Sequence, residues 1–199
     1  TIKKYAKYLA HWQSEPDGGQ YSAIQQGFRL SSGELMTWLN SDDRFHPFAF
    51  DTIAAAFLKR PEVSWIMGRP NSITSTGQPK SFSNSLPRWS RQLYLELKYR
   101  YPFVQQEGTF WRRGLWQKAG ARLRTEMKMA GDLELWTRFF RHAQLYTLDA
   151  LVASFRYQPN QKTQSLLQRY FDEAEDVLRE EAAQFQLSTD RTLMPAPDP

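Results

Sequence analysis

Residues 34–43 read ELMTWLNSDD, and the interpretation of the whole sequence depends on this stretch. Glu34–Asn40 is short and apolar and is followed by polar residues, which predicts a buried strand. Asp42 and Asp43 then lie at the carboxyl end of that strand. Ligands of α/β folds bind beyond the carboxyl ends of the strands, so the sequence predicts a binding site at this pair of acids.

Helical and strand-like segments alternate on both sides of this stretch. Further strands are expected over residues 63–67, 103–110 and 145–157, and a long loop with room for a hairpin over 68–87. Helices are expected at the start of the chain up to residue 10 and over residues 21–30, 47–59, 87–101, 112–119 and 132–142. This alternation predicts an α/β fold, with a mixed sheet flanked by helices.

The sequence ends with a long amphipathic helix over residues 163–187, followed by a tail over 188–199. The apolar positions of the helix recur at helical spacing, which predicts packing against the body or a partner. We expect its outer face to carry the acidic side chains Asp172, Glu173, Glu175, Asp176, Glu180 and Glu181.

The composition excludes several classes of protein. The 199 residues suffice for one domain, and 41% hydrophobic residues provide a core. The absence of cysteine excludes disulfide scaffolds and thiolate metal sites, and fits a cytoplasmic protein. Residues 1–162 carry a net charge of +10 and residues 163–199 a net charge of −5. A basic body favours an anionic ligand such as a nucleotide phosphate.

Three carboxylates at two places could carry chemistry. Asp42 and Asp43 could hold a divalent cation, since Mg²⁺ and Mn²⁺ prefer oxygen ligands; alternatively, either acid caps a turn or the following helix. Asp132 could act as a general base toward a hydroxyl, and the alternative is that it is the N-cap of the helix over residues 132–142.

Glu107 is a fourth candidate, because it lies on a predicted strand and would be partly buried. The alternative for Glu107 is an ion pair with Arg112 or Arg113. The three histidines have no ligand spacing, and the sequence contains neither a P-loop nor a dinucleotide fingerprint.

Three runs of sequence, in this order, resemble family 2 glycosyltransferases. Residues 14–43, from SEPDGGQ to WLNSDD, resemble the nucleotide-sugar region of that family. Residues 106–120, beginning QEGTFWRR, resemble its acceptor-side segment, and residues 131–138, GDLELWTR, resemble its catalytic-base segment. The resemblance covers about residues 1–170.

The resemblance implies a GT-A fold and a transfer, with inversion, of a sugar from a nucleoside diphosphate donor to an acceptor hydroxyl. Asp43 would bind the metal, Mn²⁺ or Mg²⁺, and Asp42 would contact the donor ribose or the metal shell. Asp17 would lie in the loop that approaches the nucleotide, and Asp132 would be the general base.

On the acceptor side, or in the layer behind it, the resemblance places Glu107, Trp111 and Arg112. Many members of the family have a histidine after the last strand, in an Arg-x-His-Pro pattern. Gln158 stands at that position here, where it can hydrogen-bond a phosphate.

The resemblance also implies a division of the chain and a set of partners. Residues 1–162 would form a partial GT-A domain, N-terminally truncated because the family's first strand–helix–strand unit is absent from this sequence. The acceptor would be a saccharide or a lipid-linked acceptor, as in polysaccharide biosynthesis, and nucleic acid would not be a partner. Peripheral association with the inner face of the membrane is left open.

Two other functions remain open from the sequence. One is a nucleotidyltransferase-like enzyme acting on sugar nucleotides, which consumes a nucleoside triphosphate where sugar transfer releases a nucleoside diphosphate. The other is a non-catalytic module that binds an anion or a partner, suggested by the basic residues in 88–100. Such a module would bind polyanions more tightly than a nucleotide sugar, with a steep dependence on salt.

Overall fold

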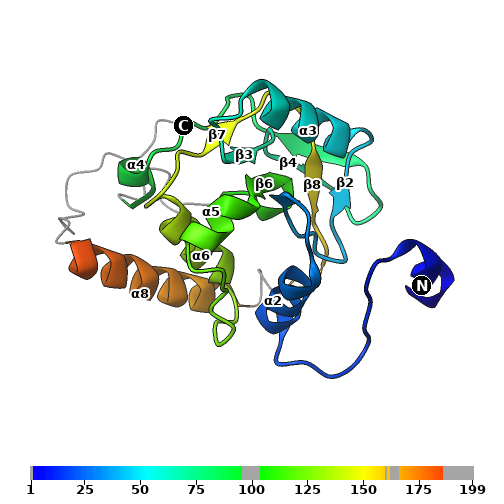
Figure 1. Ribbon diagram of the computed structural model, residues 1–199, viewed down its shortest axis with the longest axis horizontal. Helices are drawn as coiled ribbons and strands as arrows, with labels where there is room; N and C mark the ends of the chain where they lie inside the picture. The colour runs from blue at the N-terminus through cyan, green and yellow to red at the C-terminus, as the bar shows by residue number, and fades with distance from the viewer. Residues whose placement is uncertain (1, 96–103, 160, 162–165, 186–199) are drawn as a thin grey trace.

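Two short mixed sheets lie at the centre of the molecule (Figure 1). The computed structural model describes residues 2–95, 104–159, 161 and 166–185. The first sheet has the order β1-β6-β3-β7, formed by Leu35–Met36, Thr109–Arg112, Trp65–Met67 and Tyr146–Thr147. The second sheet has the order β2-β8-β4-β5, formed by Arg44–Phe45, Ala153–Arg156, Asn71–Ile73 and Pro79–Phe82.

Helices cover the sheets and extend beyond them (Figure 1). The short helices near the chain start, α1 and η1, lie apart from the body and bury no side chain. The helices are α1 (Ile2–Tyr5), η1 (Ala6–Tyr8), α2 (Gln20–Leu30), α3 (Ala49–Lys59), α4 (Arg91–Leu95), η2 (Gln106–Gly108), α5 (Arg113–Lys118), α6 (Gly131–Phe139) and α8 (Leu167–Phe185). Within the described residues, no helix is long and apolar enough to cross a membrane.

The chain passes from the first sheet to the second at two places, after β3 and after β7, and the strands on either side of these crossings form parallel pairs. β3 pairs with β7 in the first sheet, and the chain then continues into β4 and β8, which pair in the second. Gly68 lies where β3 passes toward β4, and its N–H donates to the carbonyl oxygen of Gly108. A Cβ at Gly68 would lie 2.4 Å from Cγ2 of Val152 and 2.9 Å from the carbonyl oxygen of Ala150, so only glycine fits this crossing.

Both faces of the first sheet are buried, and the side chains of its central strands alternate between two cores. Trp65 and Trp111 point into a large aromatic core shared with α2, α5, α6 and α8. Ile66 and Phe110 point to the other face, where α3 packs with Ile53. This alternation follows from the two-residue repeat of a strand, and it gives the layered α/β arrangement.

The sequence predicted this fold class correctly, whereas several element boundaries were wrong. Of the strand expected over Glu34–Asn40, only Leu35–Met36 pairs with a neighbour. The strand expected over 103–110 begins at Thr109, after a short 3₁₀ turn, and runs to Arg112. The segment 145–157 divides into β7 and β8, and the strand β2 was not predicted. Parts of the helices expected over 87–101 and 163–187 lie outside the described residues.

The acidic face of the last helix was predicted wrongly at two of its six acids, Glu173 and Glu181. Glu173 accepts hydrogen bonds from backbone amides of the body, and Glu181 is only 1% exposed. Glu181 forms ion pairs with Arg91 and Arg141, which lie in α4 and just after α6. The remaining acids of this face, Asp172, Glu175, Asp176 and Glu180, are exposed as expected.

We predict that Gly68→Ala destabilises the protein by about 1–3 kcal/mol, because the new methyl group meets a backbone carbonyl that has little room to move. Urea unfolding followed by circular dichroism measures this change. Gly27→Ala is the matched control, since a Cβ there meets no atom within 4 Å in the middle of α2. The control is expected to gain about 0.5–1 kcal/mol from the better helix propensity of alanine. Equal effects at both positions would contradict the proposed close approach at Gly68.

Candidate active site

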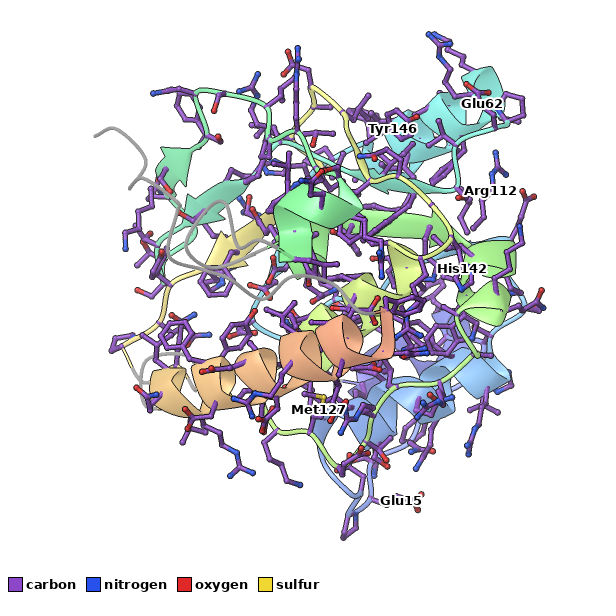
Figure 2. The ribbon with its side chains drawn as sticks, turned by 90° about the vertical axis from the view of Figure 1, so that its left-hand side faces the viewer. Glu15, Glu62, Arg112, Met127, His142 and Tyr146 are labelled. Atoms are coloured by element: carbon purple, nitrogen blue, oxygen red, sulfur yellow. The ribbon has the colours of Figure 1, made fainter. Side chains whose placement is uncertain are left out.

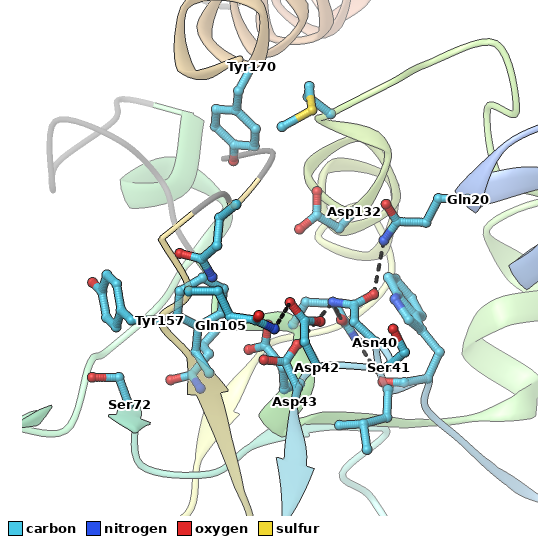
Figure 3. Close-up of a pocket in the computed structure, with 18 of the residues that line it drawn as sticks. Gln20, Asn40, Ser41, Asp42, Asp43, Ser72, Gln105, Asp132, Tyr157 and Tyr170 are labelled. Atoms are coloured by element: carbon cyan, nitrogen blue, oxygen red, sulfur yellow. Dashed lines mark hydrogen bonds between the residues drawn. The ribbon is translucent and has the colours of Figure 1, made fainter. Parts of the chain in front are cut away.

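A cavity of about 1520 Å³ opens between α2, the turn after β1, the loop after β8 and the start of α6. Figure 3 shows the Asp42–Asp43 turn at its centre, Asp132 on the wall above, and Gln20 and Tyr157 on opposite sides. Single-ligand pockets usually measure roughly 300–1,000 Å³, so this cavity has room for two substrates.

The turn that carries Asp42 and Asp43 is held from β8. The backbone N–H of Arg156 donates to Oδ1 of Asp43 at 2.8 Å, and Nε of Arg156 donates to the carbonyl oxygen of Asp42 at 2.5 Å. Nδ2 of Asn40 donates to Oδ2 of Asp43 at 3.2 Å, and Nε2 of Gln158 donates to Oδ2 of Asp42 at 3.4 Å. The two carboxylates are therefore fixed in place and lie at the cavity wall.

Glu107 lies beside this turn and is only 4% exposed. Its Oε2 atom has no hydrogen-bond partner among the described residues, and no ion pair joins it to Arg112 or Arg113 there. Burial, together with the charge of Asp43, raises the pKa of Glu107 to about 8. The ion pair considered as the alternative for Glu107 is therefore not formed.

Burial also raises the pKa of Asp43, against the lowering effect of its hydrogen bonds from Arg156 and Asn40. The carboxyl groups of Asp42, Asp43 and Glu107 thus share a partly desolvated wall of the cavity, where a cation would relieve their mutual repulsion. Among the described residues, no group of three or more His, Cys, Asp and Glu side chains is arranged to hold a metal ion alone. The donor set fits Mg²⁺ or Mn²⁺ with one or two carboxylates, provided that a substrate supplies further oxygen ligands.

Asp132 is the second residue of α6, and its N-cap is Ala130. The alternative that Asp132 is the N-cap is therefore wrong. Asp132 lies within the first turn of α6, where its Oδ1 accepts from the N–H of the next residue, Leu133, at 2.9 Å. Burial raises the pKa of Asp132 to about 6, against the lowering effect of that hydrogen bond. The titratable groups that interact with it are Tyr21, Tyr94, Glu107 and Tyr170.

The loop before α2 forms another part of the wall. Oδ1 of Asp17 accepts from the N–H of Gly19 at 2.8 Å, and this turn brings the Asp17 side chain to the cavity. Nε2 of Gln20 donates to Oδ1 of Asn40 at 2.9 Å, which connects the start of α2 to the acidic turn. The sequence-predicted residues Asp17, Asp42, Asp43, Glu107, Asp132 and Gln158 all line this one cavity.

Trp111 and Arg112 do not line it. Trp111 is fully buried in the aromatic core, against Trp136 and Phe139. The guanidinium of Arg112 donates to the carbonyl oxygens of Phe57 and Val63 and pairs with Glu34, and Figure 2 shows it on the same side of the molecule as Glu62. Neither residue touches the cavity, since Trp111 lies in the core and Arg112 against α3, so of their two predicted places only the layer behind the acceptor side stays a prediction.

The sequence reasoning missed three side chains that shape the cavity. Tyr21 donates from its hydroxyl to the carbonyl oxygen of Met129 at 2.8 Å, beside the start of α6. Gln106 donates to the carbonyl oxygen of Trp38 at 2.7 Å, and Tyr170 reaches the cavity from α8. They come from separate elements, so no local pattern could identify them.

The comparisons with known proteins bear on the fold. No family model matches the sequence. An uncharacterised glycosyltransferase of Mycobacterium tuberculosis is 58% identical over 37 residues, which are 19% of this chain and 14% of that protein. The crystal structure of S. aureus TarS with UDP-GlcNAc matches 96% of this chain and 54% of its own, with a TM-score of 0.68 and 16% identity.

A second solved structure is glucosyl-3-phosphoglycerate synthase of Mycobacterium tuberculosis with Mn²⁺, UDP and phosphoglyceric acid. It matches 92% of this chain and 58% of its own, with a TM-score of 0.51 and 14% identity. This chain therefore spans little more than half the length of the structures that it resembles. The likeness shows that the chain has the GT-A fold, and it confirms the resemblance to family 2 glycosyltransferases.

The raised pKa of Asp132 predicts how its removal affects stability. The folded-state pKa is about 6, against an ordinary 3.8, so as the pH rises from 4 to 7 the native protein must ionise a group where its charge is disfavoured. Asp132→Asn avoids this cost and keeps the acceptor for Leu133. We expect the variant to be more stable than the wild type by about 1–2 kcal/mol at pH 7.5.

At pH 4 the two proteins are expected to converge, because both carry a neutral side chain at this position. Urea unfolding at pH 4, 5.5 and 7.5 measures the difference between the two proteins. A difference that does not change with pH would show that the Asp132 pKa is not raised.

Proposed function

We propose that this chain is the catalytic part of a nucleotide-sugar-dependent glycosyltransferase that transfers a sugar, with inversion, to an acceptor hydroxyl. The observation that carries the proposal is the single cavity that holds the Asp42–Asp43 turn and Asp132 within a GT-A fold. The size of the cavity, and the UDP-sugar or UDP in the structures it resembles, support binding of a donor and an acceptor together.

Asp43, assisted by Asp42, would hold a Mn²⁺ or Mg²⁺ ion with the donor diphosphate. The bound cation would offset the negative charge that develops on the leaving diphosphate. Gln158, which donates to Asp42, would hydrogen-bond a phosphate oxygen, and Asp17, which also lines the cavity, would approach the nucleotide. A cation bound at the turn would favour the ionised form of Glu107, whose Oε2 has no partner among the described residues and whose pKa is raised to about 8 by burial and the charge of Asp43.

Asp132 would accept the proton of the acceptor hydroxyl. The acceptor oxygen forms its bond to the anomeric carbon while the bond from that carbon to the diphosphate breaks, and the bonding electron pair leaves with the diphosphate. Attack from the face opposite the leaving group inverts the anomeric centre. A pKa near 6 suits a base that works at neutral pH, since the carboxylate is then ionised but still more basic than an ordinary aspartate.

The acceptor that we propose is a saccharide or a lipid-linked acceptor in polysaccharide synthesis at the inner face of the membrane. The basic net charge of residues 1–162 suits the donor diphosphate and a phosphate-bearing acceptor. The division proposed for the chain is a GT-A domain over residues 1–162, a C-terminal helix over 163–187 and a tail over 188–199. In the described part of that helix, α8 packs on α6.

Asp43→Ala is expected to weaken Mn²⁺-dependent binding of UDP at least about tenfold, because diphosphate and cation lose their carboxylate anchor. Calorimetric titration of UDP, with and without Mn²⁺, measures the change. Asp51→Ala is the matched control, since Asp51 is an exposed acid on α3 that does not line the cavity. Unchanged Mn²⁺-dependent affinity in the Asp43 variant would remove this residue from the metal site.

Asp132→Asn is expected to lower turnover by roughly 10²–10⁴-fold while donor affinity stays the same, because the variant cannot accept a proton. The assay is UDP release from UDP-glucose or UDP-GlcNAc with Mn²⁺, and UDP release also separates sugar transfer from nucleotidyl transfer. The wild-type rate should fall below about pH 6, as Asp132 becomes protonated. Near-normal turnover of Asp132→Asn would exclude Asp132 as the base, and Glu107 would be tested next.

A further inference from the structure

We propose that Glu173, on α8, is a positioning residue that holds Asp132 in its working place by binding the backbone just before α6. The inference rests on the proposed function, because it assumes that Asp132 is the base. Glu173 itself does not line the cavity, and it therefore acts through the chain that carries Asp132.

One carboxylate oxygen of Glu173 accepts hydrogen bonds from three successive backbone amides. Oε2 accepts from the N–H groups of Lys128 at 3.2 Å, Met129 at 2.9 Å and Ala130 at 3.0 Å. The other oxygen, Oε1, accepts from Lys128 N at 3.1 Å and from Nε of Arg169 at 3.1 Å. Successive amides that converge on one point form a concave anion site, and here its occupant is a side chain of the same protein.

Glu173 remains ionised in this position. Burial by itself raises the pKa of its carboxyl group, but the hydrogen bonds from Ala130, Met129 and Lys128 outweigh that effect and lower it. A negative charge at this place also faces the amino end of α6, where the helix dipole is positive. Ala130, the N-cap of α6, has no side-chain capping bond of its own, so Glu173 supplies the acceptor that a capping side chain usually provides.

The bound segment directly precedes Gly131 and Asp132 and has no regular secondary structure. Tyr21 holds it from the other side, with its hydroxyl on the carbonyl oxygen of Met129. A Cβ at Gly131 would lie 2.8 Å from the Tyr21 ring, so the backbone packs directly against that ring. Two elements, α2 and α8, thus hold the backbone segment that leads directly into Asp132.

α8 is itself anchored at its far end, which makes it a firm support. Glu181 pairs with Arg91 at 2.7 Å and with Arg141, and Arg141 follows α6. From its first turn to its middle, Tyr170, Ala174 and Val177 pack into the aromatic core, and Figure 2 shows Met127 beside this helix. α8 therefore holds the chain before α6 through Glu173 and the chain after α6 through Glu181.

The test compares Glu173→Ala and Glu173→Gln in the full-length protein by UDP release from UDP-glucose or UDP-GlcNAc with Mn²⁺. Glu173→Ala is expected to lower kcat roughly tenfold to hundredfold, as misplacement of a reacting group does, with KM for the donor within about twofold. The pH midpoint of the acid limb should move from about 6 toward the ordinary value of aspartate, because Asp132 becomes more solvated. Glu173→Gln, which keeps one acceptor oxygen for the amides, should lie between Glu173→Ala and the wild type.

Two controls separate positioning from charge and from stability. Glu175→Ala removes the same charge from the exposed side of α8 and should leave kcat unchanged. Phe57→Leu weakens the core beneath α3, away from the cavity, and shows what a general loss of stability does to kcat. Amide hydrogen exchange at Lys128, Met129 and Ala130 should be faster in both Glu173 variants and unchanged in the two controls.

A double variant decides whether Glu173 acts through Asp132. In the Asp132→Asn background, Glu173→Ala should cause no further loss of turnover. A further tenfold loss there, or an effect of Glu173→Ala on kcat equal to that of Phe57→Leu, would overturn the inference while leaving Asp132 as the base. Normal turnover of Asp132→Asn alone would instead overturn the proposed function.

Discussion

The contact between Trp38 and Trp136 fixes the geometry of the whole site. Their rings stack with centroids 5.8 Å apart and planes 14° from parallel. Trp38 lies four residues before Asp42, and Trp136 lies four residues after Asp132, one helical turn into α6. Because both rings also pack on Trp111 of the central strand β6, the acidic turn and the start of α6 are held at a fixed separation. A closely packed core has low compressibility, so it can hold two walls of a cavity in register.

The electrostatics of the cavity differ from those of the surrounding body. Residues 1–162 carry a net positive charge, yet the cavity wall gathers carboxyl groups whose pKa values are raised by burial, among them Asp43, Glu107 and Asp132. Such an arrangement costs folding free energy when the groups ionise, and it persists where a ligand with a cation compensates it. Under the proposed function, the basic body would draw an anionic donor toward the cavity, and the acidic wall would provide a place for the cation that accompanies it.

The last helix adds a second kind of constraint. The two inward acids of α8, Glu173 and Glu181, bind groups on either side of α6. Of the exposed acids of the same helix, Glu175 and Asp176 pair with Arg179 of α8 itself, and Glu180 pairs with Arg124. Ion pairs between exposed side chains contribute little to stability, and a buried carboxylate with several donors contributes much more. The same residue type thus forms surface ion pairs on one face of α8 and contacts with the body on the other.

The sequence by itself determined the alternation of elements, the acidic turn after the strand at residues 35–36, and the place of Asp132 at the start of a helix, because local patterns of apolar residues and acids specify these features. Only the tertiary structure decided that Trp111 and Arg112 lie away from the cavity, that Glu107 has no arginine partner, and that Glu173 and Glu181 face inward. The physical reason is that the partners of these side chains are distant in the chain: Arg112 bonds to a carbonyl oxygen of α3, and Glu173 to amides more than forty residues away. A periodic pattern defines which residues share a face, but the contacts of that face depend on how the whole chain packs.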